Sequence, residues 1–487
     1  MFKLFLLLLN LNIFSLGPFV SGTFYPSDKK EITNFLSTAF KNAQQYNKKT
    51  NDKDIKAIIS PHAGYQFSGK IAAISYSAIK GDYDTFIIIA PSHRKYIESA
   101  TTTKEIFLTP LGEVYVDKDF TDLLLKNKLF NEDSNSFVNE HSVEVQLPFL
   151  QYKFKNFKIV PILVNTTDTS KLTDISRAIK EAIDKSGKKI FIIVSSDFTH
   201  YPSYDTSKIV DSSIIESLKY MDENYFYLSH KIILNKKIKN LETTACGAEA
   251  IFVGMSLSKL LGANEFIPLE NKNSYDADPK NSTKESVVGY VSGVFAKSKN
   301  TNGYKTILSE EQKKILLDEA RNSIISYLNG NRNIIDNTLS EITEFNLPKA
   351  VFVTINENGY LRGCIGSTEP VLLLNDAVKY FALSAAFGDR RFKPLEKGEI
   401  NKIKIEISIL SPLKEINDYK KIREKVDGVM VSSSKGNGLF LPQVWDYFDK
   451  KEDFLNQLCT EKAGLDKNCW KDKETKLFIF QVEKFSE

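Results

Sequence analysis

Cysteine is scarce in this chain of 487 residues, which contains four, and no two of them form a C-x-x-C pair. So few cysteines cannot hold a fold of this length together, and we expect a reducing compartment or thiols with individual roles. Cys459 and Cys469 lie around a lysine-rich loop, and we assign no role to them. Histidine is nearly as rare, with five residues, so the position of each one is informative.

An excess of charge of one sign is also absent, because 65 lysines and arginines balance 61 aspartates and glutamates, for a net charge of +4. Nucleic-acid binders usually concentrate basic residues on one face, so we expect no nucleic-acid partner. By contrast, 42% of the residues are hydrophobic, including 33 Phe and 21 Tyr, which excludes wholesale disorder. The length predicts two or three domains.

Long hydrophobic runs are missing except at the amino terminus. Residues 4–14 are mostly apolar and follow Lys3, and Ser15-Leu16-Gly17 is similar to a signal-peptidase cleavage site. The run is shorter than the roughly 20 residues that cross a bilayer. Residues 1–17 are therefore either a leader or a buried first element, and the sequence leaves both interpretations open.

Short β-branched runs alternate with helical patterns in the first half of the chain. Such runs are typical of strands covered on both faces, as in a parallel sheet. The predicted strands are residues 56–60, 85–90, 158–164, 189–195 and 286–295, and the predicted helices are residues 28–46, 69–80, 172–185 and 248–261. This alternation predicts an α/β domain with a mostly parallel sheet over residues 18–297.

A polar stretch without periodicity, residues 298–304, predicts a linker. Ser309 is the expected cap of the helix that follows, because Glu310 and Glu311 fill its first turn. The later strand patterns, with a helical pattern at residues 371–387, predict a smaller α+β domain over residues 305–485. These predicted strands are residues 350–355, 361–365, 402–410 and 428–432.

Three predicted strands of the first domain run into residues that suit metal ligation or acid–base chemistry. His62 follows the first strand, His93 follows the second, and Asp197 and His200 follow the strand at residues 189–195. Ligands bind outside the carboxyl ends of parallel strands, so we expect these side chains to share one crevice. A single histidine would be more typical of a structural imidazole, and it is the number of three that favours a site.

Cys246 lies at the start of the apolar helix predicted at residues 248–261, where aligned backbone N–H groups favour a thiolate, although a lone cysteine there is more typical of a small buried residue. Together with His62 and His93 it predicts a metal site of two imidazoles and one thiolate, which suits iron, copper or zinc. His141 and Glu144 are spaced i and i+3, on one face of a helix. That face is either solvated or turned toward the crevice.

The second domain has a candidate site of its own. Cys364 lies between two glycines and close to Arg362, a setting typical of reactive thiols. Further along, Asp389 and Arg390 lie in a turn that is either an anion pocket or a tight turn with an internal arginine–aspartate pair.

Motifs over nearly the whole chain resemble two known families. Residues 18–297 resemble the Memo (mediator of cell motility) family, also called AmmeMemoRadiSam system protein B, and residues 305–485 resemble the AMMECR family, or AmmeMemoRadiSam system protein A. The Memo-like motifs are Val20-Ser21-Gly22-Thr23-Phe24-Tyr25-Pro26, Pro61-His62-Ala63-Gly64-Tyr65 with Ser68-Gly69, Pro91-Ser92-His93, Glu140-His141-Ser142 through Leu147-Pro148, Ser195-Ser196-Asp197-Phe198-Thr199-His200 and Cys246-Gly247. The AMMECR-like motifs are Leu361-Arg362-Gly363-Cys364-Ile365-Gly366, Ala386-Phe387-Gly388-Asp389-Arg390-Arg391-Phe392 and Gly438-Leu439-Phe440-Leu441-Pro442.

The Memo family is similar in fold to class III extradiol dioxygenases, which are non-haem iron enzymes, although Cys246 stands where those enzymes have a carboxylate. The resemblance implies a metal pocket carried by His62, His93 and Cys246, with iron(II) or copper as the metal and zinc as the alternative. It also implies a radical S-adenosylmethionine protein as partner and a cytoplasmic setting, while the amino-terminal segment leaves export open.

Three functions remain open, and the resemblance favours the first. In a metal-dependent, dioxygenase-like oxidoreductase, His200 would transfer protons and Asp197 would orient it, and Cys364 and Arg362 are candidate catalytic residues of the second domain. In a binding module without chemistry, the pocket would hold a peptide or a small anion. In a zinc hydrolase, His200 would assist a bound water. We expect four residues to contact the substrate or ligand: Tyr65, His141, Glu144 and Arg390.

Overall fold

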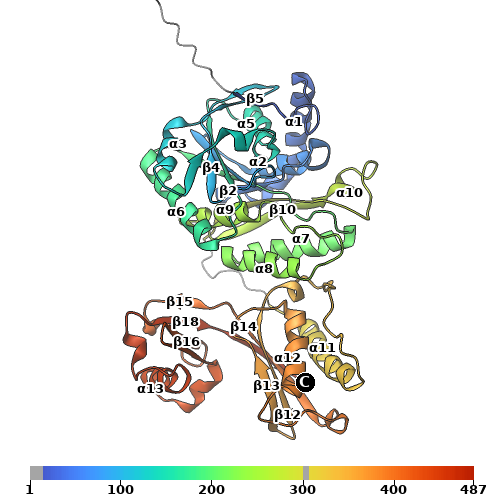
Figure 1. Cartoon of the computed structure of the whole chain (residues 1–487), viewed down its shortest axis with the longest axis vertical. Helices are drawn as coiled ribbons and strands as arrows, with labels where there is room; N and C mark the ends of the chain where they lie inside the picture. The colour runs from blue at the N-terminus through green and yellow to red at the C-terminus, as the bar shows by residue number, and fades with distance from the viewer. Residues whose placement is uncertain (1–14, 300–306) are drawn as a thin grey trace, which may run out of the picture. The chain divides into compact units, whose positions relative to one another are not determined.

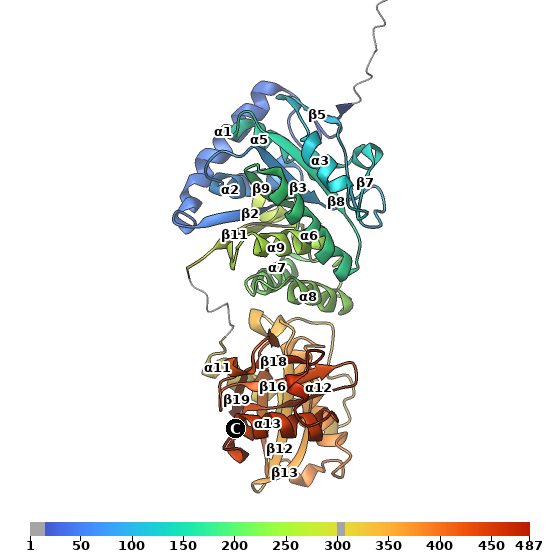
Figure 2. The same ribbon diagram turned by 90° about the vertical axis from the view of Figure 1, so that its left-hand side faces the viewer.

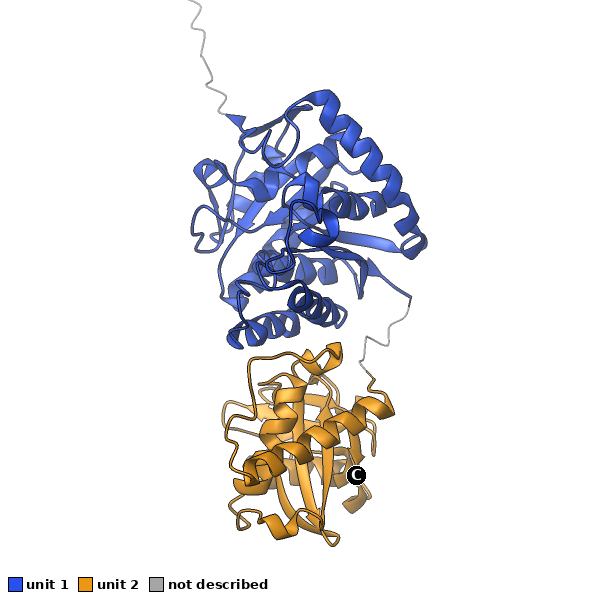
Figure 3. Cartoon of the chain, turned by 90° about the vertical axis from the view of Figure 1, so that its right-hand side faces the viewer, with its two compact units in different colours: residues 1–305 blue, residues 306–487 orange. Residues whose placement is uncertain are grey.

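The computed structural model describes residues 15–299 and 307–487 (Figure 1). It divides into two compact units, residues 1–305 and 306–487 (Figure 3). Residues 1–14 of the predicted leader and residues 300–304 of the predicted linker lie outside the described residues. In the described ranges, no helix has the length and apolar character needed to cross a membrane.

Unit 1 is built on an eight-stranded mixed sheet with the strand order β10-β11-β2-β9-β3-β8-β4-β7. Its centre, from β2 to β8, is parallel, as predicted, whereas β10 and β11 add to β2 in antiparallel fashion and β4 adds to β8 in the same way. The strands are β2 (Asp54–Ser60), β3 (Thr85–Ala90), β4 (Ala100–Thr102), β7 (Phe130–Glu132), β8 (Lys158–Val164), β9 (Ile190–Ser195), β10 (Glu265–Asn273) and β11 (Gly289–Lys297).

Helices cover both faces of this sheet, which explains why the central strands are apolar without alternation. Figure 2 shows α6, α7, α8 and α9 along one face and α1, α2 and α5 along the other. The helices of unit 1 are α1 (Lys29–Ala43), α2 (Lys70–Ala78), α3 (Lys118–Leu125), α4 (His141–Glu144), α5 (Leu147–Lys153), α6 (Thr169–Ser186), α7 (Tyr204–Leu218), α8 (Glu223–Asn235), α9 (Ala248–Leu260) and α10 (Ser274–Ala277). The mixed α/β class therefore agrees with the alternation in the sequence.

A small second sheet carries the start of the described chain. Strand β1 (Ser15–Leu16) pairs in parallel with β5 (Ile106–Thr109), which also pairs with β6 (Gly112–Val114). The side chain of Leu16 is fully buried. The residues predicted as a cleavage site therefore form part of the folded unit.

Unit 2 is a smaller α+β unit with two antiparallel four-stranded sheets, ordered β13-β12-β14-β19 and β15-β18-β16-β17. Helix α11 (Glu310–Leu328) begins at the predicted cap, where Ser309 and Gln312 form a reciprocal capping box. The other helices are α12 (Leu374–Phe387) and α13 (Lys451–Gln457). The strands are β12 (Ala350–Glu357), β13 (Tyr360–Gly366), β14 (Ile403–Leu410), β15 (Lys414–Ile416), β16 (Gly428–Ser433), β17 (Gly436–Phe440), β18 (Lys476–Phe480) and β19 (Val482–Ser486).

Cys459 and Cys469 form a disulfide in unit 2, which corrects the expectation that they have no role. Both side chains are buried in a core cluster that also contains Trp445 and Trp470. The two cysteines are 10 residues apart in the sequence, and this spacing alone does not show whether they form a disulfide or remain free thiols. The protein thus has one covalent cross-link and two free cysteines, Cys246 and Cys364.

We expect the Cys459→Ser substitution to lower the stability of unit 2. Closing a loop of this length removes conformational entropy from the unfolded chain, which corresponds to about 2–3 kcal/mol. Thermal unfolding of the full chain, followed by calorimetry, should show an earlier transition for the variant. A reductant should shift wild type in the same direction and leave the variant unchanged. Identical unfolding of oxidised wild type and Cys459→Ser would contradict a stabilising cross-link.

Candidate metal centre

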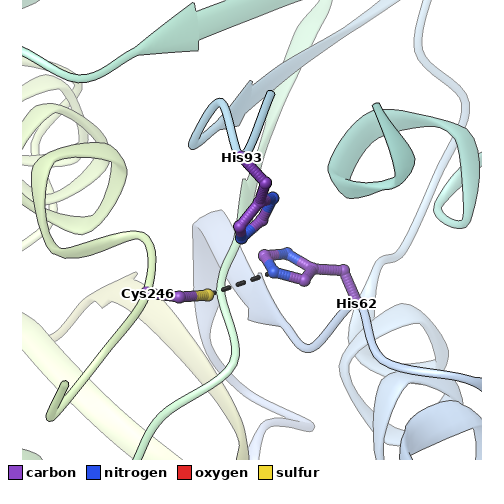
Figure 4. A group of neighbouring side chains, drawn as sticks. All are labelled: His62, His93 and Cys246. Atoms are coloured by element: carbon purple, nitrogen blue, oxygen red, sulfur yellow. Dashed lines mark hydrogen bonds between the residues drawn. The ribbon is translucent and has the colours of Figure 1, made fainter. Parts of the chain in front are cut away.

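Three donor groups from distant parts of unit 1 meet at the carboxyl edge of the central strands. His62 follows β2, His93 follows β3, and Cys246 precedes the N-terminal end of α9. One donor atom of each lies within 4.8 Å of the other two, and Cys246 Sγ is 3.1 Å from His62 Nε2 (Figure 4). The structure thus brings together the three residues predicted from the sequence.

The other hydrogen bonds of His62 turn the lone pair of its Nε2 toward this point, where it accepts from the Cys246 thiol. Ser195 Oγ donates its only proton to the carbonyl of Ser142 at 2.6 Å and accepts from Gln146 Nε2 at 2.9 Å. Ser195 Oγ also lies 2.9 Å from His62 Nδ1. Because its own proton is already used, it must accept the proton of Nδ1. Burial lowers the pKa of His62 well below its usual value, so the ring is neutral and carries its proton on Nδ1.

His93 has the same orientation but a different partner. Its Nδ1 lies 3.0 Å from Glu140 Oε1, and its backbone N–H donates to Glu140 Oε2 at 2.6 Å. Burial alone would raise the pKa of Glu140, but the hydrogen bond and charge of His93 and the backbone N–H of Ser142 bring it down to about 2. The ionised carboxylate accepts from Nδ1 and leaves Nε2 as the available nitrogen.

Cys246 is held beside the end of β9 by its own backbone. Its N–H donates to the carbonyl of Asp197 at 3.2 Å, and the next N–H, of Gly247, donates to Ser196 Oγ at 3.0 Å. A Cβ on Gly247 would lie 2.8 Å from the carbonyl oxygen of Ser195, so only glycine lets the loop approach this closely.

Burial, followed by the charge of Asp197, raises the pKa of the Cys246 thiol. The expectation that the helix start favours a thiolate is therefore wrong for the metal-free protein. A bound cation would displace the thiol proton, as metal binding to cysteine generally does. Two imidazoles that turn Nε2 toward one point and one displaceable thiol proton fit a transition metal or zinc.

Asp197 and His200 lie next to this cluster, but not in the predicted relation. Asp197 Oδ1 accepts from the backbone N–H of His62 at 2.8 Å, and Ala63 N–H also contributes, so this carboxyl holds the loop after β2. The expectation that Asp197 orients His200 is therefore wrong. His200 is fixed by its backbone, which bridges Thr243 and Val288. In the part of the chain that the structure describes, its buried Nε2 has no hydrogen-bond partner.

The four predicted substrate contacts are not all near the cluster. His141 lies near the cluster, because its ring centroid is 4.5 Å from that of His93 and 5.4 Å from that of His62. Glu144, on the same short helix, instead accepts from Phe19 N–H, Val20 N–H and Tyr25 Oη at 2.9, 3.0 and 2.6 Å. Tyr65 is buried and donates to the Val145 carbonyl at 2.7 Å. The structure therefore places Glu144 and Tyr65 in the core, and His141 alone of the three at the site.

In unit 2 the two arginine motifs form ion pairs within the fold. Arg362 binds Glu399 through Nε at 2.7 Å and a second nitrogen at 3.1 Å, so its charge is not directed at Cys364. Asp389 accepts from Cys364 N–H at 2.9 Å and pairs with Arg391. The internal arginine–aspartate pair is thus present, made by Arg391 rather than by Arg390, which is exposed.

Three residues of the site have no predicted role in the sequence: Glu140, Ser195 and Gln146. All are buried, and each makes its contacts with residues far away in the chain. Glu140 and Ser195 occur in the family-like motifs, which was the one available signal. Gln146 lies inside the matched stretch from Glu140 to Pro148, in the turn between α4 and α5, but no local pattern distinguishes it from other polar residues.

Comparison with known families assigns both domains of the chain. A family model described as Memo-like protein matches residues 17–294, which include every residue of the cluster. The chain belongs to the Memo-like protein family. A second family model, AMMECR1, matches residues 317–485, so this Memo-like protein is a fusion of two family domains.

Archaeal proteins match parts of this chain over nearly their own full length. A MEMO1 family protein of Methanobrevibacter smithii is 36% identical over 289 residues, covering 57% of this chain and 98% of the relative. A MEMO1 family protein of Methanosarcina mazei is 33% identical over 274 residues, covering 56% of this chain and 96% of the relative. A crystal structure of the uncharacterized protein PH0010 from Pyrococcus horikoshii is 33% identical and covers 37% of this chain and 93% of its own, with a TM-score of 0.34.

Proposed function

We propose that the Memo-like domain is a metal-dependent redox protein that binds iron(II) or copper through His62, His93 and Cys246. The observation that supports this most directly is the hydrogen bonding behind the ligands. Both imidazoles carry their proton on Nδ1, bound to Ser195 or to Glu140, so that two Nε2 atoms and one sulfur remain for a single ion. Histidines with a purely structural role in the core would not need to point their Nε2 atoms at the same place.

The types of donor atom limit which metals the site would bind. Imidazole and thiolate together suit iron, copper and zinc, and only the first two would supply one-electron chemistry when bound. Three protein donors also leave coordination positions open, and His93 is the most exposed of the three ligands. We infer a dioxygenase-like oxidoreductase acting with a radical S-adenosylmethionine partner.

The remaining residues of the site would bind and move protons. Burial lowers the pKa of His200 to about 4 and that of His141 to about 4, so both rings are neutral near pH 7 and can accept or relay a proton. The buried Asp197 keeps the loop of His62 in place through backbone N–H groups. We assign His200 as the proton-transfer group, with His141 beside it, because His200 Nε2 and His141 Nδ1 are both buried and have no hydrogen-bond partner among the described residues.

The test is anaerobic loading of the full chain with Fe(II), Cu(I) or Zn(II), followed by gel filtration and metal quantification. We expect stoichiometric binding by wild type and a loss of more than about 100-fold in affinity for His93→Ala, because even the loss of a ligand's outer partner costs 10–100-fold. Admission of air should give oxygen uptake by the iron- or copper-loaded wild type and none above background by His93→Ala.

The outcomes separate the candidate functions. Tight binding of zinc alone, without oxygen uptake with iron or copper, would favour a zinc hydrolase. Equal metal content of wild type and His93→Ala would exclude a metal role for this site. A binding module without chemistry would then be the better interpretation.

A further inference from the structure

The two imidazole ligands of the centre have chemically different partners. His62 donates from Nδ1 to a neutral hydroxyl, Ser195 Oγ, whereas His93 donates to a carboxylate, Glu140 Oε1. The side chain of Glu140 is completely buried, and that of His93 is 27% exposed. A buried anion therefore lies behind the more accessible of the two rings.

Glu140 holds His93 at two points. One carboxylate oxygen accepts from the ring and the other from the backbone N–H of the same residue, at 3.0 and 2.6 Å. Oε1 also accepts from the backbone N–H of Ser142, at 2.9 Å. Three donors to one carboxylate fix the acceptor in space, and the two that come from His93 fix both the position and the rotation of its ring.

The same short segment also supports the other imidazole. Ser142 accepts from Ser195 Oγ through its carbonyl, and Gln146 donates to Ser195 Oγ. Gln146 is itself oriented by Tyr76, whose hydroxyl donates to Gln146 Oε1 at 2.9 Å. Residues 140–146 therefore contain Glu140, the partner of His93, and they also hold Ser195, the partner of His62, in place.

The charges at the centre are then unequal on the two sides. Once a cation has displaced the thiol proton, the sulfur of Cys246 and the carboxylate of Glu140 both bring negative charge to the centre. The interaction of Glu140 with a cation is stronger for the ion of higher charge, and burial of the carboxylate limits screening by solvent. A carboxylate on the remote nitrogen also makes its imidazole a stronger donor.

We propose that Glu140 is the positioning residue of this centre, which fixes His93 as an Nε2 donor and makes the centre prefer the more highly charged oxidation state of a bound ion. This inference rests on the proposed metal site and adds to it the residue that sets its redox preference. The hydroxyl partner of His62 has no such effect, because it brings no charge.

The test compares Glu140→Gln with Ser195→Ala in the full chain. Affinities for Cu(I) and Cu(II) are measured by competition with chelators, with Zn(II) as a divalent ion that does not change oxidation state. For Glu140→Gln we expect the affinity for Cu(II) and Zn(II) to fall about 10–100-fold and that for Cu(I) to fall clearly less. A tenfold change in the ratio corresponds to an increase of 59 mV in the potential of the bound copper. Ser195→Ala should weaken both oxidation states by similar factors.

A second measurement does not depend on a metal. In metal-free wild type, ¹⁵N shifts of the imidazoles should show His93 in the Nδ1–H form, and Glu140→Gln should give a mixture of the two tautomers. Glu140→Asp, which retains the charge, should keep most of the wild-type ratio of Cu(II) to Cu(I) affinity, even where both affinities are lower. This variant replaces Glu140→Gln in the comparison if the glutamine variant does not fold.

Two results would overturn the proposal. One is an Nε2–H form of His93 in metal-free wild type, which would mean that Glu140 does not hold the ring as described. The other is an equal shift of the affinity ratio in Glu140→Gln and Ser195→Ala. If wild type binds none of the ions, the proposed metal function fails, and the tautomer of His93 still decides whether Glu140 positions that ring.

Discussion

Metal should be lost almost completely from a Cys246→Ala variant, while a Cys364→Ala variant should bind as wild type does. Cys246 supplies the sulfur of the cluster with His62 and His93, and its removal takes away one of the three donors of that set. We expect the affinity for Cu(I) to fall by more than about 100-fold, above the 10–100-fold typical of outer partners. Competition with a chromophoric chelator measures the difference.

The control is closely matched, because Cys364 is the other free cysteine and lies in unit 2. If the loss of any free thiol weakened metal binding, both variants would bind less metal than wild type. Cys246→Ser should bind more weakly than wild type but better with zinc than with copper(I), because an oxygen donor is harder than a thiolate. Equal Cu(I) affinity in wild type and Cys246→Ala would mean that the sulfur is not a ligand.

Gly363→Ala should destabilise unit 2 strongly, although it adds a single methyl group. The added Cβ would lie 2.1 Å from the backbone carbonyl oxygen of Ala385, in the helix that packs on this strand. Backbone cannot rotate away as a side chain can, so β13 and α12 would have to separate. We expect a loss of about 1–3 kcal/mol or more, which for a unit of this size lowers Tm by about 2–4 °C per kcal/mol.

Gly398→Ala is the matched control, because a Cβ at Gly398 would meet nothing within 4 Å. Calorimetry of the full chain should show the early transition only in Gly363→Ala, with metal binding by unit 1 unchanged. Equal melting of the two variants would contradict the close approach of β13 to α12.

Features that depend on local sequence could be predicted well. The central strands of unit 1 are apolar along their whole length because helices bury both faces, so β3 and β8 were found with their correct ends. Ser309 could be recognised as a cap because Glu310 and Glu311 follow it directly, in the first turn of the helix. The ligands at the ends of β2 and β3 followed from the general behaviour of parallel sheets.

Features that depend on distant contacts could not be predicted. Strand β10 alternates buried and exposed residues irregularly and contains Pro268, so it resembles a loop in sequence. Glu140 is one of many acidic residues until the fold places it next to His93. The role expected for Asp197 was wrong for the same reason, since its acceptor atoms face the backbone of His62.

The carboxylate of Glu144 and the strand β1 have a consequence for any shortened form of the protein. Cleavage after Gly17 would remove β1 together with the buried Leu16, and the free amino end would begin next to the residues that Glu144 holds. Strand β5 would then lose its parallel neighbour and become a sheet edge with unpaired backbone groups. Such edges are templates for pairing with another chain, so this shortened form would be prone to self-association, whereas in a chain that begins at Ser15 the outermost strand on this side is β1, which is only 2 residues long.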